Sequence, residues 1–363
     1  MENKESFEFM KIGILTFSCA YNFGAILQCY ALQEHLSLMG QEVYVINYRP
    51  YYLESKKPKI SKHNVRYLRR FLLHRSSFIS YEHFIDKNLK LTNVANSETE
   101  LFQIISSFDY VIIGSDQIWN TTYNGHDPVW LGSFSSALNR KPHIIFYAAS
   151  AGDAVFSASE LFSLKKQLLY FDAISVRENK LRQKLENMFP YKNIDVVLDP
   201  SLMVDEHIWE KWQKPLINEK YILVYQARQD DCVYRIANDI AIQLNAKVFT
   251  VDFYNNNYKF GAKLKVVSPA GFVSLVRNAQ CVVTTSFHGT AFSIINKTPF
   301  YTLRLNDGAD ERSYNLLSSI GLNDRFIDKN STIQFTSVNF DIPNKKLSEL
   351  RKQSQLFLTK HIV

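Results

Sequence analysis

Short apolar runs flank a segment of helical periodicity at the start of the chain. Residues 11–17 form one run, residues 25–39 carry apolar side chains at helical spacing up to Gly40, and residues 42–48 form a second run. A strand, a helix and a strand in this order predict a βαβ unit with parallel strands. Four further runs, unbroken as in parallel strands covered on both faces, predict strands at 110–113, 143–147, 173–176 and 195–198.

The same alternation begins again beyond residue 215, after a polar stretch that starts at Asp199. Three more apolar runs predict strands at 221–225, 247–251 and 281–285. Helical spacing predicts a helix at 234–244, between the first two of these strands. A chain of 363 residues exceeds what one hydrophobic core usually organises. We therefore expect two Rossmann-like α/β domains, residues 1–205 and 206–363, with a helix from Lys345 onward as the candidate to cross back.

Polar and small residues follow the predicted strands, at the edge where parallel sheets bind their ligands. Asn22 and Gly24 lie between the first strand and its helix. The free N–H groups of a helix start attract an anion, and a glycine lets a ligand approach the backbone closely. Both residues are therefore candidates for substrate binding, with a plain tight turn as the alternative.

A denser polar block follows the strand predicted at 110–113. Asp116 is a candidate base for a sugar hydroxyl, and Trp119 is a candidate stacking surface for a sugar ring. The alternatives are that Asp116 caps the next element and that Trp119 belongs to the core. The candidates for substrate binding in this block are Ser115, Gln117 and Trp119.

A third polar block follows the strand predicted at 281–285 and precedes an apolar helix over 291–296. His288 lies near the start of that helix, where its ring would face a bound anion, so it is a candidate proton donor or phosphate ligand. A structural role is the alternative. Its neighbours, taken as candidates for substrate binding, are Ser286, Gly289 and Thr290.

Two arginines complete the candidate site, because a planar guanidinium suits carboxylate and phosphate groups. Arg177 closes the strand predicted at 173–176, and Arg312 lies in a polar loop after Phe300 and Tyr301. A surface ion pair is the alternative for both. No cluster of residues has metal-ligand spacing, so we expect neither a metal nor a cofactor.

The formal net charge of +7 is concentrated in one segment. Between Ser55 and Tyr81 there is no acidic residue but eight basic ones: Lys56, Lys57, Lys59, Lys62, Arg66, Arg69, Arg70 and Arg75. One interpretation is a solvated face, and the other is a peripheral membrane contact through anionic headgroups or a lipid pyrophosphate. The segment has no nucleic-acid-binding motif, so nucleic acid is not an expected partner.

The chain lacks the eighteen consecutive apolar residues of a membrane span, and its acidic opening is unlike a signal peptide. Its four cysteines are scattered rather than arranged as a disulfide framework. We therefore expect a cytoplasmic protein, located at the inner face of the membrane if the basic segment binds lipid.

Together these segments resemble the polysaccharide pyruvyl transferase family. The matching blocks keep the family order along most of the chain: 12–16, 21–28, 30–32, 45–50, 114–120, 175–178, 198–200 and 285–293. The resemblance implies a GT-B-like fold with the active site between its domains. It also implies phosphoenolpyruvate as donor substrate and, as acceptor, two hydroxyls of a hexose in a surface polysaccharide such as capsule or exopolysaccharide, or in its lipid-linked precursor.

The family's donor-binding histidine and arginines correspond here to His288 and Arg177. In the mechanism that we expect, His288 protonates the methylene carbon of the donor and Asp116 accepts a proton from a sugar hydroxyl. Some relatives have Arg-Leu-His where this chain has Ser286, Phe287 and His288, so another cation must replace that arginine. Two alternatives stay open: a nucleotide-sugar glycosyltransferase of the GT-B type and a non-catalytic carbohydrate-binding relative.

Overall fold

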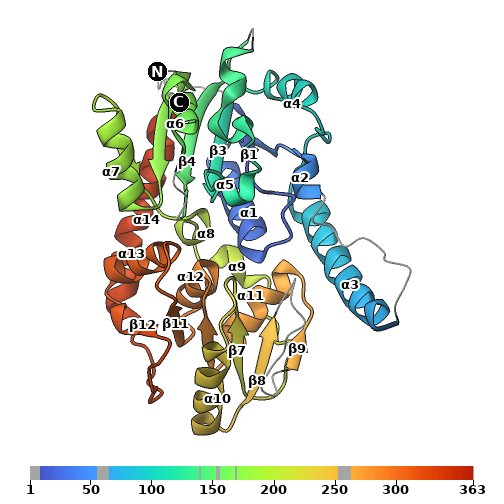
Figure 1. Cartoon of the computed structure of the whole chain (residues 1–363), viewed down its shortest axis with the longest axis vertical. Coiled ribbons are helices and arrows are strands. Elements are labelled where there is room, and N and C mark those ends of the chain that lie inside the picture. The colour runs from blue at the N-terminus through green and yellow to red at the C-terminus, as the bar shows by residue number, and fades with distance from the viewer. Residues whose placement is uncertain are drawn as a thin grey trace, which may run out of the picture.

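Two parallel sheets organise the chain. The computed structural model describes residues 9–54, 65–138, 140–152, 156–167, 170–251 and 263–362. These residues form two six-stranded sheets, which lie one above the other in Figure 1. The first has the order β2-β1-β3-β4-β5-β6 and the second β12-β11-β10-β7-β8-β9. Two parallel α/β domains confirm the predicted GT-B-like architecture.

The first sheet contains the six strands predicted before Asp199, and the second contains three predicted strands and three more. The strands are β1 (Lys11–Leu15), β2 (Glu42–Val45), β3 (Tyr110–Asp116), β4 (His143–Ala149), β5 (Ala173–Val176), β6 (Ile194–Val196), β7 (Tyr221–Tyr225), β8 (Lys247–Val251), β9 (Lys263–Lys265), β10 (Cys281–Thr284), β11 (Phe300–Arg304) and β12 (Phe326–Asp328).

Helices connect the strands and cover the sheets. They are α1 (Phe23–Leu38), α2 (Tyr51–Glu54), α3 (Val65–Asn88), α4 (Glu98–Ile105), α5 (Thr121–Asn124), α6 (Ala158–Gln167), α7 (Asn179–Met188), α8 (Pro200–Met203), α9 (His207–Glu210), α10 (Cys232–Leu244), α11 (Pro269–Asn278), α12 (Phe287–Ile295), α13 (Asp310–Ile320) and α14 (Asp341–His361), with 3-10 turns at Pro128–Leu131, Ser133–Ser136 and Asn323–Arg325.

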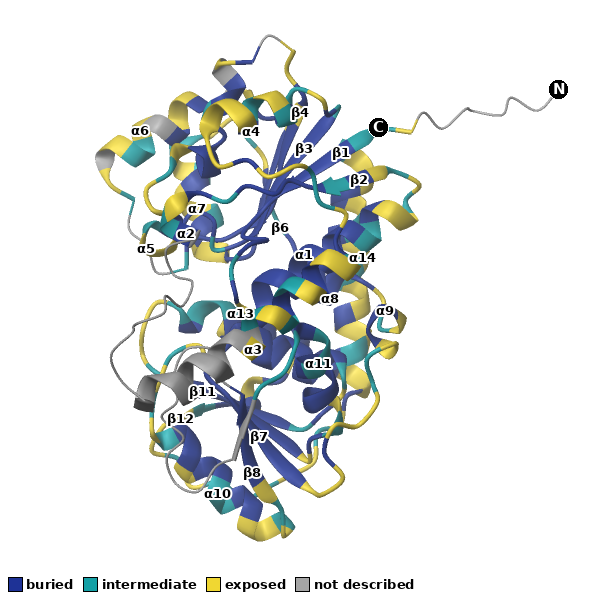
Figure 2. Cartoon of the chain, turned by 90° about the vertical axis from the view of Figure 1, so that its right-hand side faces the viewer, coloured by how far each residue is buried: buried dark blue, intermediate teal, exposed yellow. Residues whose placement is uncertain are grey.

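One apolar core runs through both domains. It joins Ile14 of β1 and Tyr147 of β4 to Leu223 of β7, Phe272 of α11 and Phe292 of α12, all buried. The outer faces of the two sheets have separate cores. Figure 2 shows the buried strands of each sheet and the buried helix surfaces between the sheets. Because the interface is large and apolar, the two halves of any site between them are held in a fixed relation.

The last helix spans the two domains along one side of the molecule (Figure 1). Its Ser354 hydroxyl accepts a hydrogen bond of 2.9 Å from the Leu198 N–H, and Arg351 Nε donates to the Leu202 carbonyl at 2.7 Å. The Phe357 ring lies 6.1 Å from the Tyr147 ring of β4. Helix α14 thus binds the connection between the domains as well as the first sheet.

Part of the basic segment lies outside the described residues. Residues 55–64 are not described, and the side chains of 65–75 in α3 are not described either. Contact of this segment with a membrane therefore stays a prediction. Among the helices that the structure describes, none is both long enough and apolar enough to cross a bilayer.

Candidate active site

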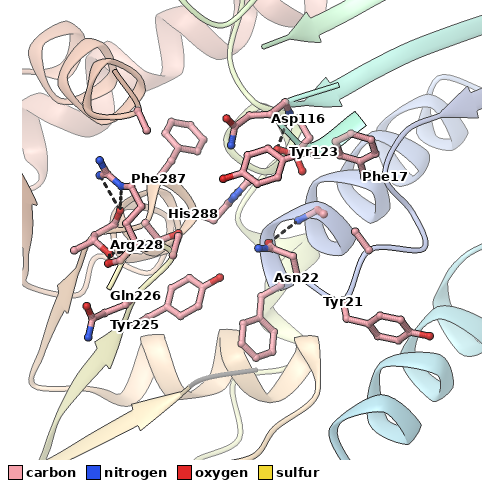
Figure 3. Close-up of a pocket in the computed structure, with 18 of the residues that line it drawn as sticks. Phe17, Tyr21, Asn22, Asp116, Tyr123, Tyr225, Gln226, Arg228, Phe287 and His288 are labelled. Atoms are coloured by element: carbon pink, nitrogen blue, oxygen red, sulfur yellow. Dashed lines mark hydrogen bonds between the residues drawn. The ribbon is translucent and has the colours of Figure 1, made fainter. Parts of the chain in front are cut away.

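A cavity of about 590 Å³ lies between the two domains (Figure 3). The first domain lines it with the segment from Phe17 to Ala25 and with Asp116, Gln117 and Tyr123. The second domain lines it with residues that follow β7, β10 and β11, where parallel strands end. The loops that the sequence singled out therefore meet at one place.

Helix α1 begins at this cavity and leaves room for a ring from the other domain. The Asn22 side chain caps the helix, because its Oδ1 accepts hydrogen bonds from the N–H groups of Gly24 at 2.9 Å and Ala25 at 3.2 Å. A Cβ built on Gly24 would overlap the imidazole of His288. Gly24 is thus required for the close approach of His288 to the helix start.

Helix α12 supplies His288 from its first turn. The Ser286 hydroxyl caps this helix by accepting a 3.3 Å hydrogen bond from the Gly289 N–H. His288 is only 6% exposed, yet it lines the cavity, with its Nε2 3.4 Å from Asp199 Oδ2. Because the helix begins at Phe287 and not at the predicted position 291, the ring projects from a fixed helical turn.

Asp199 connects this histidine to Arg177 of the first domain. One oxygen, Oδ2, lies 2.7 Å from Arg177 Nη2 and 3.4 Å from His288 Nε2. The other, Oδ1, caps α8 by accepting hydrogen bonds from the Ser201 N–H at 2.8 Å and the Ser201 hydroxyl at 2.5 Å. Burial alone would raise the pKa of the Asp199 carboxyl, but Arg177 and His288 outweigh it and hold the pKa well below its usual range.

Arg177 is fixed by groups of the first domain and is buried, at 7% exposed, and it is not among the described residues that line the cavity. Its Nε donates hydrogen bonds to the Ser115 hydroxyl at 2.9 Å and to the Ala148 carbonyl at 3.2 Å. Its Nη1 is buried and has no hydrogen-bond partner among the described residues. Ser115 therefore orients the Arg177 guanidinium through a hydrogen bond and does not itself line the cavity.

Arg312 brings a second guanidinium to the same place. It lies 5.6 Å from the centre of the Phe287 ring, and Arg177 lies 5.5 Å from that ring. With its oxygen turned toward Arg312, the Gln117 amide accepts hydrogen bonds of 3.1 and 3.3 Å from the two terminal nitrogens. Arg312 belongs to α13, so its predicted place in a loop is wrong; β11 and α13 occupy that stretch.

Glu178 lies behind the two arginines and completes the buried charges. Its carboxylate accepts a hydrogen bond from the Ser150 hydroxyl. Burial raises the pKa of the Glu178 carboxyl, although Ser150, Arg312 and Arg177 oppose this effect. Two guanidinium groups and one imidazole thus gather around buried carboxyl groups, and of these three cationic or basic groups Arg312 and His288 line the cavity.

Asp116 ends β3 with a backbone φ of 77°, a left-handed conformation that few residues other than glycine adopt. Its Oδ1 accepts a 2.8 Å hydrogen bond from the Gln117 N–H. Figure 3 shows its side chain beside Tyr123, above His288. This turn aims a carboxylate into the cavity, as a general base requires.

The family model for polysaccharide pyruvyl transferase matches residues 22–307, which include the cavity-lining residues of both domains from Asn22 to Asp307. The chain belongs to this family. None of the curated proteins matches its sequence.

Solved structures with a similar chain path share little sequence with this pyruvyl transferase family member. The UDP-GlcNAc 2-epimerase of Methanocaldococcus jannaschii is 14% identical, with 93% of this chain and 92% of the other covered and a TM-score of 0.47. The epimerase of Rickettsia bellii is 12% identical over 98% and 99%, with a TM-score of 0.46. The glycosyltransferase SnogD of Streptomyces nogalater is 11% identical over 98% and 96%, with a TM-score of 0.42. These likenesses are distant.

Several predicted site residues of this pyruvyl transferase family member need correction. Trp119 cannot stack on a sugar, because its ring is 0% exposed and its indole N–H donates to the Trp130 carbonyl at 3.0 Å inside the core. Five other candidates for substrate binding are not among the described residues that line the cavity: Gly24, Ser115, Arg177, Gly289 and Thr290. Two of them, Gly289 and Thr290, have packing roles. A Cβ on Gly289 would overlap Thr284, and the Thr290 hydroxyl bonds to the Ser286 carbonyl at 3.1 Å, so both pack α12 onto its sheet.

Sequence reasoning missed several residues of the site. Asp199 was interpreted as part of a domain boundary and of a block that resembles the family, but not as a site residue, although Asp-Pro after a strand is also a helix-capping signal. Tyr123 and Arg228, which also line the cavity, carry no pattern that distinguishes them from other surface residues.

Proposed function

We propose that this protein transfers the enolpyruvyl group of phosphoenolpyruvate onto two hydroxyls of a hexose in a polysaccharide or its precursor, forming a cyclic pyruvate ketal. The observation that carries the proposal is the meeting of Arg177 and His288, from opposite domains, at one oxygen of Asp199. Phosphoenolpyruvate combines a carboxylate, a phosphate and an enol carbon that must gain a proton. Guanidinium groups and a proton donor are the matching protein groups.

The groups that favour an anionic donor come from four places in the fold. Arg177 offers its unpartnered Nη1, and Arg312 lies over the same Phe287 ring. The starts of α1 and α12 add helix N-termini, which favour anions. We infer that Arg312, together with Arg177, replaces the arginine that some relatives carry at the position of Ser286.

In the proposed reaction, protonated His288 gives its proton to the methylene carbon of the donor while the first sugar hydroxyl attacks the central carbon. Asp116 takes the proton of that hydroxyl. The bond between the central carbon and the phosphate oxygen then breaks, and the oxygen of the second hydroxyl forms a new bond to the same carbon. One hydroxyl proton leaves with phosphate and the other restores the proton that His288 gave, so the atoms balance.

Asp199 supports the step in which His288 acts. Its Oδ2 lies 3.4 Å from His288 Nε2 and so gives the imidazole a fixed neighbour on one side. Because Oδ1 is held by Ser201, Oδ2 has one direction in which to point. The proposed steps use side chains of this chain and phosphoenolpyruvate as substrate.

The test is turnover of phosphoenolpyruvate with a panel of galactosides, mannosides and N-acetylhexosaminides. We expect phosphate release that depends on the acceptor, with a ketal methyl group in the product by NMR. Nucleotide release from a nucleotide sugar, without reaction of phosphoenolpyruvate, would instead identify a glycosyltransferase. Glycan binding without any turnover would identify a non-catalytic relative.

A further inference from the structure

One aromatic ring in the cavity differs from the others in its exposure. Tyr123 is 45% exposed, whereas the other aromatic side chains that line the cavity are between 0% and 8% exposed. Those buried rings are Phe17, Tyr21, Phe23, Tyr81, Tyr225 and Phe287. They form the walls, so Tyr123 is the ring among the described lining residues with a face available to a ligand.

Tyr123 is held in place although its ring is exposed. It belongs to α5, where the buried Asn120 caps the helix by accepting a 3.0 Å hydrogen bond from the Thr122 N–H. The buried Asn124 donates from Nδ2 to the Ile118 carbonyl at 3.0 Å. A ring on a pinned helical turn loses little freedom when a ligand stacks on it.

The position of Tyr123 matches that of an acceptor sugar. Figure 3 shows its ring beside Asp116 and above His288. A pyranose ring on Tyr123 would therefore present its hydroxyls to the candidate base and to a donor held near the imidazole. The sequence placed this function on Trp119, four residues earlier, which lies in the core.

The charges on this side of the cavity favour an uncharged sugar. Asp116 contributes a carboxylate, and Arg228, across the cavity, is already engaged. Arg228 Nη1 pairs with Asp310 at 2.8 Å and also with Asp307, while Nη2 donates to the Thr285 carbonyl at 3.0 Å. The other basic side chains among the described lining residues, Arg312 and His288, are assigned to the donor in the proposed function. An acidic sugar bound beside the donor would therefore face the carboxylate of Asp116 without a further cation to balance it.

We propose that Tyr123 and Asp116 form an acceptor subsite for an uncharged pyranoside, which stacks on the Tyr123 ring and directs a hydroxyl to Asp116. The subsite rests on the proposed function for its place in a reaction, but not for its ability to bind a sugar.

The first test separates acceptor from donor kinetics in Tyr123→Ala, Tyr123→Phe and Tyr123→Trp. Loss of a stacking partner should raise the KM of the acceptor about tenfold in Tyr123→Ala. The KM of phosphoenolpyruvate should stay unchanged, and the two aromatic variants should keep an acceptor KM near that of the wild type. The matched control is Tyr314→Ala, since Tyr314 is 49% exposed and does not line the cavity. A change in the KM of the donor alone, or no change, overturns the subsite.

The second test measures binding without turnover. Methyl galactopyranoside and methyl mannopyranoside are titrated into the wild type against the corresponding methyl uronides. We expect the uronides to bind about tenfold more weakly, because their carboxylate is repelled by the carboxylate of Asp116. In Asp116→Asn the difference in affinity between glycosides and uronides should become smaller. Equal or tighter binding of the uronides overturns the inference.

The two proposals fail in different ways. If no glycoside supports phosphate release from phosphoenolpyruvate, the proposed function fails, while glycoside binding that weakens in Tyr123→Ala still supports the subsite. If phosphate is released but Tyr123→Ala leaves the acceptor KM and glycoside binding unchanged, the subsite fails alone.

Discussion

Helices α1 and α12 begin in similar ways on opposite sides of the cavity. Each is capped by a polar side chain, Asn22 in one and Ser286 in the other, and each places a phenylalanine directly after the cap. The two rings have different partners. Phe23 stacks on Phe272 of the second domain at 4.7 Å, whereas Phe287 lies against the two guanidinium groups.

The difference between the two helix starts explains how the site is assembled. After its phenylalanine, α1 has Gly24, which provides space, and α12 has His288, which fills that space. Neither start alone forms a donor site. Because the stacked Phe23 fixes α1 on the second domain, the position of the imidazole depends on both helices.

Of the changes at the two helix starts, removal of the His288 imidazole should lower the rate of phosphate release most. His288→Ala keeps both caps and the space at Gly24 but loses the proposed proton donor. A positioned acid contributes about a hundredfold to ten-thousandfold in rate, and we expect a loss of that size in phosphate release. The control is His207→Ala, which removes a surface histidine with a 62% exposed side chain. A His288→Ala enzyme with full activity would refute the assignment.

Filling the space at Gly24 should cause the next largest loss of rate. In Gly24→Ala the added methyl group overlaps the His288 ring, so the ring must move. A displacement of about 1 Å can lower the rate about a hundredfold, and helix α1 itself tolerates alanine. The control is Gly271→Ala near the start of α11, where the Cβ would lie 2.9 Å from Val267 Cβ, outside the cavity. Equal rates for the two variants would argue against contact between Gly24 and His288 in solution.

Asp199→Asn should act mainly on stability, and in a pH-dependent way. The variant leaves the buried Arg177 without its counter-charge, which costs about 3–5 kcal/mol of unfolding free energy. The pKa of Asp199 is depressed in the folded state, so its contribution is present above the unfolded pKa of about 3.9 and is lost as the pH falls through the folded pKa.

Urea unfolding at neutral pH and at pH values below about 4 measures this dependence. The wild type should be more stable than Asp199→Asn at neutral pH, and the difference should shrink in acid. A difference that is constant across this range, or larger in acid, is incompatible with an ionised Asp199.

The helix caps should give the smallest effect. Asn22→Ala and Ser286→Ala each remove a cap, and each should lower the unfolding free energy by about 1 kcal/mol. Asn22 accepts two backbone hydrogen bonds and Ser286 one from the helix start, so Asn22→Ala should be the more destabilised variant in thermal unfolding. A larger loss of stability in Ser286→Ala than in Asn22→Ala would contradict the capping hydrogen bonds of the two helices as the structure describes them.

The sequence predicted most of the central strands, because buried parallel strands are unbroken apolar runs. Strands β9, β11 and β12 were missed. Two of them, Lys263–Lys265 and Phe326–Asp328, have three residues each, and Phe300–Arg304 merges with the polar stretch that follows it. Short strands at the side of a sheet leave too little pattern to be recognised.

The candidate site was predictable only as a set of loops. The carboxyl ends of parallel strands lie at the same edge of a sheet, so the sequence alone predicted that the blocks around Asn22, Asp116 and His288 lie close together. Which side chains face the cavity depends on tertiary packing: Trp119 is turned into the core, where it bonds to Trp130. Asp199 meets His288 across 89 positions of the chain, as their numbers show, and no local pattern reports such a contact.

The most direct measurement is a calorimetric titration of phosphoenolpyruvate into the wild type and into Arg312→Ala, with UDP-N-acetylglucosamine titrated in parallel. A donor site built from both helix starts and two guanidinium groups predicts that phosphoenolpyruvate binds the wild type and that Arg312→Ala binds it at least about tenfold more weakly. It also predicts no binding of the nucleotide sugar. Binding of the nucleotide sugar without binding of phosphoenolpyruvate would contradict the account.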